Sequence, residues 1–349
     1  MKRIGSIILR WQPFERGPAP RSRIQNLIKA DLSDQHAEPT APKKMRYSLS
    51  DLKTAANNPK LVLREMNQLF YSSFGRHESN PYGRSVFEED WDNLVILDAC
   101  RHDFFERQAD LPGQLDSRTS LGSCTPEFVE YNFRNRSLRD TVYVTANSWY
   151  LKLRDEIGSE VYDLVDLLSS PDRKYSDPDH NIVLPETMTE VARRAHDENP
   201  KKRLIVHYIQ PHHPFIGPTG ECYFQTDSAS LPEVVREEPN ATRELVERAY
   251  RENVDRAVDA VADLLPNLRG KTVVTADHGE MLGERHEYIP IREYGHPAGI
   301  WSDLLTTVPW HVYTNGERKE TVAERPVAGS DGESGYAVDE RLESLGYKM

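Results

Sequence analysis

The residue types best suited to chemistry stand together in the segment Asp277-His278-Gly279-Glu280. This segment follows the apolar run 271–276, which predicts a buried strand. Side chains alternate between the two faces of a strand, so neighbouring residues converge on one ligand only where the strand ends and the chain turns. Gly279 permits such a turn. A carboxylate beside an imidazole forms half of a divalent-metal site, although Asp277 could instead cap a helix and leave His278 without a role.

A second carboxylate, Asp98, follows the apolar run 93–97 and precedes Arg101 by three residues. A carboxylate at the end of a buried strand, close to a guanidinium, could hold a cation and an oxyanion together. The alternative interpretation is that Asp98 is a helix N-cap. Asn147 ends the apolar run 141–146 in the same way.

Hydroxyl and thiol groups come before a predicted helix at Cys124-Thr125-Pro126. Proline at the first helical position would make Thr125 the N-cap. A residue there lies at the positive end of the helix, which stabilises an alkoxide or a bound anion. Beside a dication, the oxygen of Thr125 could act as a nucleophile. An ordinary capping threonine is the simpler interpretation unless the other site residues lie close by.

Two loops carry histidines that could contact a substrate. In Pro211-His212-His213-Pro214 the prolines restrict the backbone, so at least one imidazole is held in place. His212 could bind a substrate oxygen or protonate a leaving group, whereas His213 could be a packing or capping residue. His296, in a later loop, is either a further site residue or an inert loop histidine.

The fold class follows from the strands that must position these residues. Apolar runs predict strands at 93–97, 141–146, 203–209, 271–276 and 307–313. Helical patterns separate them, most clearly between Asn240 and Leu265, and Pro309 in the last run indicates an edge strand or a strand start.

Near-continuous apolar strands that alternate with helices indicate an α/β fold with a largely parallel sheet covered on both faces. Ligands of such sheets bind beyond the carboxyl ends of the strands. We therefore expect five residues to gather at one edge of the sheet: Asp98, Asn147, His212, Asp277 and His278.

Composition limits the choice of partner and compartment. The 349 residues carry a net charge of −12, which argues against a nucleic-acid partner and leaves room for a local basic pocket. Cys100, Cys124 and Cys222 form no disulfide pattern, which fits a reducing compartment. The sequence shows no signal-peptide pattern and no run of 18 apolar residues. These features predict a cytoplasmic protein without a membrane span, and they leave the oligomeric state open.

Taken together, the motifs resemble the alkaline phosphatase superfamily, in its sulfatase-like branch, over residues 90–315 and the tail. The segment 277–284 is similar to the second metal motif of that branch and is the most specific match. The segment 211–214 resembles its substrate-side histidine loop, and 249–255 resembles the helix before its last core strand. The ending 341–347 is similar to the C-terminal signature of many sulfatase-like chains.

The resemblance implies a three-layer α/β/α sandwich, one divalent metal ion and a nucleophile that attacks phosphorus or sulfur. The ion would be zinc or manganese, given mixed nitrogen and oxygen ligands, or calcium or magnesium in a true sulfatase. The substrate would be an anionic phosphate or sulfate ester. The expected site residues are the metal ligands Asp98, Thr125, Asp277 and His278, the catalytic Thr125, His212 and Arg101, and the substrate-binding His296 and Asn147.

Two departures from the sulfatase pattern bear on the nucleophile. Sulfatases proper carry Cys-x-Pro-x-Arg, whose cysteine matures to formylglycine. The segment 124–126 begins this motif, but Phe128 stands at the arginine position, and Ala99 replaces the second acid of the usual Asp-Asp pair. Both departures favour Thr125 over Cys124 and a phosphate over a sulfate ester. A formylglycine sulfatase using Cys124, or a non-catalytic protein that binds an anionic glycan or partner, remain the alternatives.

Three regions are expected along the chain. Residues 1–85 form an N-terminal arm and helical segment, in which 13–46 has the composition of a linker. Residues 86–315 form the catalytic domain, and 316–349 form a polar tail with a short helix.

Overall fold

The apolar runs of the sequence form the centre of one sheet. The computed structural model describes residues 59–168, 170, 173–224 and 230–327. Within them, the strands of this sheet are Asn93–Leu97 (β1), Gln114–Thr119 (β2), Ser137–Thr145 (β3), Glu160–Asp166 (β4), Arg203–Tyr208 (β5), Gly270–Ala276 (β6) and Thr307–Asn315 (β9). They lie in the order β2-β9-β6-β1-β5-β3-β4.

Most of the sheet is parallel. Strand β1 pairs in parallel with β5 and β6, and β3 pairs in parallel with β4 and β5. Strand β9 runs antiparallel to both β6 and β2. All five residues of β1 are buried, as expected for a strand covered on both faces. The prediction of a largely parallel sheet is therefore confirmed.

The prediction that Pro309 marks an edge strand or a strand start is wrong, because β9 has a neighbour on each side and begins before it. The β6 ladder ends at the pair Thr275–Trp310, whereas the β2 ladder includes the pair Ser117–Pro309. Pro309, which has no N–H, thus lies one residue beyond the last pair that β9 makes with β6. An interior strand tolerates a proline there, because no donor is needed on that side.

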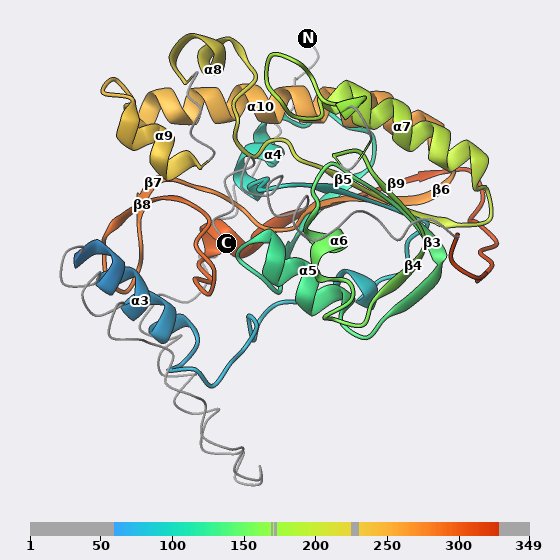
Figure 1. The fold of residues 1–349 in the computed structure, drawn as a ribbon, viewed down its shortest axis with the longest axis horizontal. Coiled ribbons are helices and arrows are strands. Elements are labelled where there is room, and N and C mark those ends of the chain that lie inside the picture. The colour runs from blue at the N-terminus through green and yellow to red at the C-terminus, as the bar shows by residue number, and fades with distance from the viewer. Residues whose placement is uncertain (1–58, 169, 171–172, 225–229, 328–349) are drawn as a thin grey trace, which may run out of the picture. The chain divides into compact units, whose positions relative to one another are not determined.

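Helices cover both faces of the sheet, which confirms the expected three-layer arrangement (Figure 1). Helices α7 (Pro185–Glu198) and α10 (Arg243–Leu264) lie on one face, and α5 (Thr125–Phe133) and α6 (Trp149–Leu153) lie on the other. The long helix predicted between Asn240 and Leu265 is α10. The shorter helices are α3 (Pro59–Tyr71), α4 (His102–Gln108), α8 (Pro218–Tyr223), α9 (Leu231–Glu237) and α11 (Asp303–Thr306).

A hairpin of β7 (Met281–Arg285) and β8 (Arg292–Gly295) follows the sheet strand β6, and helix α3 packs against it (Figure 1). The carboxylate of Glu293 on β8 is fully buried and attaches the helix. Arg64 donates to it from Nε at 2.9 Å and from Nη2 at 2.8 Å, and Lys60 Nζ lies 3.0 Å away.

Residues after β9 pack on the opposite end of the sheet. Lys319 Nζ donates to Asn93 Oδ1 at 2.7 Å, and the backbone N–H of Val322 donates to Lys201 O at 3.0 Å. These residues and helix α3 belong to the same compact unit as the sheet. We therefore propose that one domain extends from Pro59 to at least Val327, wider than the expected 86–315.

The predicted linker at 13–46 and the predicted C-terminal helix lie outside the described residues. In the part of the chain that the structure describes, no helix combines the length and the apolar character needed to cross a membrane.

Candidate active site

The carboxyl ends of β1 and β6 lie side by side, because Leu97 pairs with Ala276 in parallel register. The residues that follow them, Asp98 and Asp277, are therefore neighbours. His278 Nε2 lies 3.5 Å from Asp98 Oδ1 and 3.3 Å from Asp277 Oδ2, and all three side chains are fully buried. The structure thus brings together three of the four predicted metal ligands.

Hydrogen bonding sets the tautomer of His278. Its Nδ1 lies 2.8 Å from the carbonyl oxygen of Gly279, which can only accept, so Nδ1 carries the proton and Nε2 a lone pair. Burial lowers the pKa of His278, which keeps the ring neutral. Three donor atoms, from Asp98, Asp277 and His278, therefore converge within 4.8 Å of one another away from water. Mixed imidazole and carboxylate donors of this kind fit a divalent transition-metal ion.

Backbone and side-chain donors keep Asp277 ionised. Its Oδ1 accepts from the backbone N–H groups of Ala99 at 3.0 Å and His278 at 2.8 Å. His207 Nε2 lies 3.7 Å from Oδ2. Burial alone would raise the pKa of Asp277, but His278, His207 and the Ala99 N–H lower it well below its ordinary value. Ala99 adopts a φ of 60°, a left-handed conformation unusual for a residue with a side chain.

Thr125, the fourth predicted ligand, lies beside the same three residues. Its Oγ1 donates to Asp277 Oδ2 at 2.8 Å and lies 3.2 Å from His278 Nε2. The predicted N-cap role is wrong by one residue: Cys124 is the N-cap of α5 and Thr125 is its first helical residue. The hydroxyl still lies at the positive end of the helix, because the whole first turn contributes to that end.

Cys124 lies one residue away, with its side chain buried. Burial and the nearby Glu127 raise the pKa of its thiol well above the ordinary value. The thiol is therefore protonated at neutral pH, which makes it a poor nucleophile in its unmodified form.

Glu127 joins the loop before Thr125 to the loop after His296. Its Oε2 accepts from the backbone N–H of Ser123 at 2.9 Å, and its Oε1 accepts from the backbone N–H of Gly299 at 2.7 Å. Trp301 Nε1 donates to Oε2 at 3.3 Å. One carboxylate thus fixes two segments that lie more than 170 residues apart in the chain.

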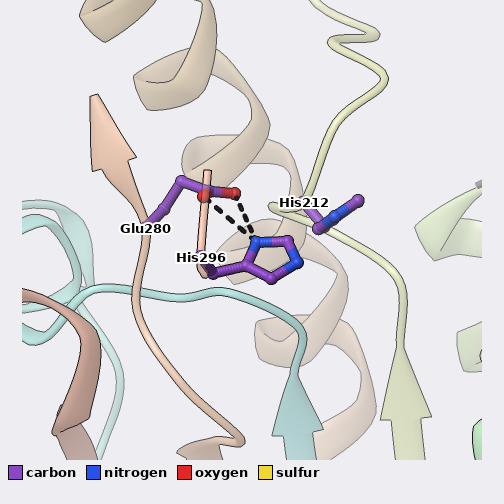
Figure 2. Close-up of side chains that lie close together, drawn as sticks. All are labelled: His212, Glu280 and His296. Carbon is purple, nitrogen blue, oxygen red and sulfur yellow. Dashed lines mark hydrogen bonds and ion pairs between the residues drawn. The ribbon is translucent and has the colours of Figure 1, made fainter. Parts of the chain in front are cut away.

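A second cluster adjoins the first. Glu280, His296 and His212 lie together, with His296 Nδ1 3.1 Å from Glu280 Oε1 (Figure 2). The ring of His296 contacts that of His278 with centroids 4.4 Å apart and planes tilted by 39°, so the two clusters adjoin each other. Burial lowers the pKa of His212 and of His296 to about 4 and raises the pKa of Glu280 to about 7.

Hydrogen bonds to Asp98 and to α10 hold the loop that carries His212 in place. The backbone N–H of His212 donates to Asp98 O at 3.1 Å. Asn253, a buried residue of α10, donates to Pro214 O at 3.0 Å and accepts from the backbone N–H of Ile216 at 2.8 Å. The predicted rigidity of this loop thus has a source beyond its prolines.

A cavity of about 970 Å³ opens beside the second cluster. Cys124, His212 and His296 line it, together with residues of α3 and α9. Cys124 and Pro126, on either side of Thr125, line this cavity, whereas Thr125 itself is buried behind them.

Two predicted site residues, Arg101 and Asn147, bind other side chains of the protein. The guanidinium of Arg101 binds Asp103 at 2.8 Å and Glu284 at 2.7 Å, so its charge is directed at these carboxylates. Asn147 Nδ2 donates to Asp98 Oδ2 at 2.7 Å, and its Oδ1 accepts from a backbone N–H of α6. The amide of Asn147 thus orients Asp98, a predicted metal ligand, whereas the prediction made Asn147 a substrate contact.

Sequence reasoning gave no role to Glu280 or His207. Glu280 stood within the quoted metal motif, two residues after His278, and this position was the available signal. His207 interrupts the apolar run of β5, and a polar residue within a buried strand was a weaker signal.

Gly279 is needed for a reason other than a turn, because a Cβ there would lie 2.1 Å from Leu304 O.

Similarity to known proteins is found at the level of structure. Neither a protein-family model nor a curated protein matches the sequence. Solved structures do. The periplasmic domain of a phosphoethanolamine transferase from Campylobacter jejuni is 14% identical, with a TM-score of 0.44 over 64% of this chain and 78% of that chain. The soluble domain of a lipooligosaccharide phosphoethanolamine transferase from Neisseria meningitidis is 13% identical, with a TM-score of 0.42 over 73% and 86%. A putative sulfatase from Bacteroides thetaiotaomicron is 13% identical, with a TM-score of 0.40 over 74% and 71%.

These are the two enzyme groups that the motifs resemble. At such low identities the likeness concerns the fold, and the chemistry has to be judged from the site. The first structure is described as a periplasmic domain, so the predicted cytoplasmic location finds no support in it.

Proposed function

We propose that this protein is a metal-dependent hydrolase or transferase that acts on phosphate or sulfate esters with Thr125 as its nucleophile. The observation that carries the proposal is the position of the Thr125 hydroxyl, 2.8 Å from Asp277 and 3.2 Å from the Nε2 lone pair of His278. Buried acids and an unprotonated imidazole nitrogen around one hydroxyl suit a cation that activates it.

The residues that would hold the ion are Asp98, Asp277 and His278, with Thr125 beside them. The donor set fits zinc or manganese, because it combines one imidazole with carboxylates. When bound, the ion would lower the pKa of the hydroxyl and offset negative charge on the ester.

The side chains then have separate roles. Thr125 Oγ1 forms the new bond to phosphorus or sulfur and releases its proton to water, because Asp277, which accepts its hydrogen bond, has a lowered pKa and is a weak base. The bond to the leaving oxygen breaks as the new bond forms, and the leaving oxygen takes a proton from water. The positive end of α5 stabilises charge on the ester oxygens. A second step passes the group from Thr125 to water or to an acceptor.

His212 and His296 would orient the ester. His212 Nδ1 donates to His213 O, which leaves Nε2 as an acceptor in the neutral ring. Because the pKa of His212 is lowered to about 4, the ring is neutral near pH 7. We therefore propose that His212 positions the substrate by accepting a hydrogen bond from a donor on its alcohol part, since an anionic ester group has no N–H or O–H, in place of the predicted protonation of the leaving group.

Trapping the covalent intermediate tests the proposal. Rapid acid quench with aryl phosphate and aryl sulfate, followed by peptide mass spectrometry, should find the transferred group on Thr125. Thr125→Ala should lose both adduct and turnover, while the matched Cys124→Ser variant keeps both. Loss of activity in Cys124→Ser alone, with a formylglycine mass at position 124, would show that the cysteine is the nucleophile.

A further inference from the structure

The cavity is larger than the reacting group requires. Its volume of about 970 Å³ lies at the upper end of the range for small-molecule sites. It runs from Cys124 and His296, beside the catalytic cluster, to helices α3 and α9. A ligand that fills it carries a sizeable group beyond the reacting ester.

The far part of the cavity is lined by positive charge. Lys60 and Arg64 of α3 and Arg236 of α9 line it, along with one acidic side chain, Glu233. A smaller hollow beside it shares Lys60 and adds two further arginines, Arg285 and Arg292. In a chain whose net charge is −12, such a gathering of cations around one opening is a local exception.

Helix α3 is attached in a way that holds these cations at the cavity wall. Glu293 is fully buried and binds two of them, so the group of three keeps one net positive charge. Arg64 contacts Glu293 through two nitrogens and serves as the anchor. Lys60 makes a single contact, and its side chain is 47% exposed. Arg236 approaches Glu233 and Glu237 only at 3.9 and 3.8 Å, and its side chain is 68% exposed.

We infer that the cavity binds an ester carrying a second anionic group, which Lys60 and Arg236 contact while the reacting group lies beside Thr125. Apolar side chains that line the cavity, such as Leu231 and Trp149, pack against the body that joins the anions. The inference deepens the proposed function, on which its description as a substrate site rests.

Two non-hydrolysable probes, phenylphosphonate and 1,4-phenylenediphosphonate, test the inference by calorimetric titration of the full chain. The wild type should bind the diphosphonate about tenfold more tightly, since partly desolvated charge-assisted contacts are stronger than exposed ion pairs. The double variant Lys60→Ala/Arg236→Ala should bind both probes within about twofold of each other. Arg194→Ala, which removes an exposed arginine on α7, serves as the matched control and should keep the wild-type preference.

Because Arg64 still binds Glu293 in the double variant, helix α3 should stay in place, and Arg236→Ala alone gives a second variant with no role in that attachment. Equal affinities in the wild type, or an unchanged preference in both variants, would overturn the inference. Turnover of aryl esters without the preference would overturn the inference alone. The preference without any turnover would overturn the proposed function alone.

Discussion

Replacement of Asn147 by alanine separates two roles for this residue. We propose that it positions Asp98, because its Nδ2 donates to Asp98 Oδ2 at 2.7 Å. Loss of an outer hydrogen bond to a metal ligand lowers metal affinity about 10- to 100-fold. That corresponds to about 1.4 to 2.7 kcal/mol of binding free energy. We therefore expect weaker Zn²⁺ or Mn²⁺ binding by Asn147→Ala, with little change in KM once the metal is saturating.

The assay is a chelator-buffered metal titration, followed by kinetics at saturating metal. Asn93→Ala is the matched control, because Asn93 is also a buried asparagine but lies at the end of β1 that is far from Asp98. Asn147 also accepts from the N–H of Trp149 at 3.0 Å, so a loss of about 1 kcal/mol of stability is expected and is measured separately. An unchanged metal affinity together with a raised KM would refute the positioning role and restore the predicted substrate contact.

Three further predictions concern stability and loop geometry. Glu127→Gln keeps one acceptor oxygen where two are used, so urea unfolding should show a loss of about 1–3 kcal/mol, and turnover should fall with it; a variant as stable as the wild type would contradict this. Gly279→Ala would place a Cβ 2.1 Å from a backbone oxygen, and we expect a fall in Tm together with loss of metal binding, whereas a normal melt would disprove the close approach. Burial and Lys319 lower the pKa of His196 to about 4 from 6.5. The unfolded state therefore binds the proton first as the pH falls, so stability decreases from pH 6.5 towards 4 by about 3 kcal/mol for this residue. His196→Gln should flatten that part of the urea-unfolding profile, and an identical slope would contradict the assignment.

The centre of the site could be predicted because topology alone places it. Parallel strands end at one edge of a sheet, so acids that directly follow two adjacent strands must be neighbours. This applies to Asp98 and Asp277, whose strands pair directly. Thr125 was predicted as a site residue chiefly through the family resemblance, because a hydroxyl at a helix start is common in proteins.

The remaining roles depended on contacts between distant segments. Arg101 was expected near the ester, but Glu284, 183 residues away, binds its guanidinium. Asn147 follows a strand as predicted, yet the direction of its amide is set by Asp98. A side chain's direction comes from the partners that the fold supplies, and spacing along the chain does not contain that information.

Two strands of the seven-stranded sheet, β2 and β4, were not predicted, and their position in the sheet explains why. Strands β2 and β4 occupy the two ends of the sheet order. Edge strands have one open side and carry polar residues, and both contain several charged or polar side chains. Apolar runs therefore predict the central strands and do not predict the edge strands.

The central claim is that Asp98, Asp277 and His278 hold a divalent ion beside Thr125. X-ray absorption spectroscopy of the Zn²⁺-loaded protein at one ion per chain tests this most directly, because it counts imidazole ligands. We expect one imidazole with oxygen ligands, and loss of that nitrogen signal in His278→Gln. Two imidazoles that persist in His278→Gln would place the ion at His212 and His296 and rule out the proposed metal site.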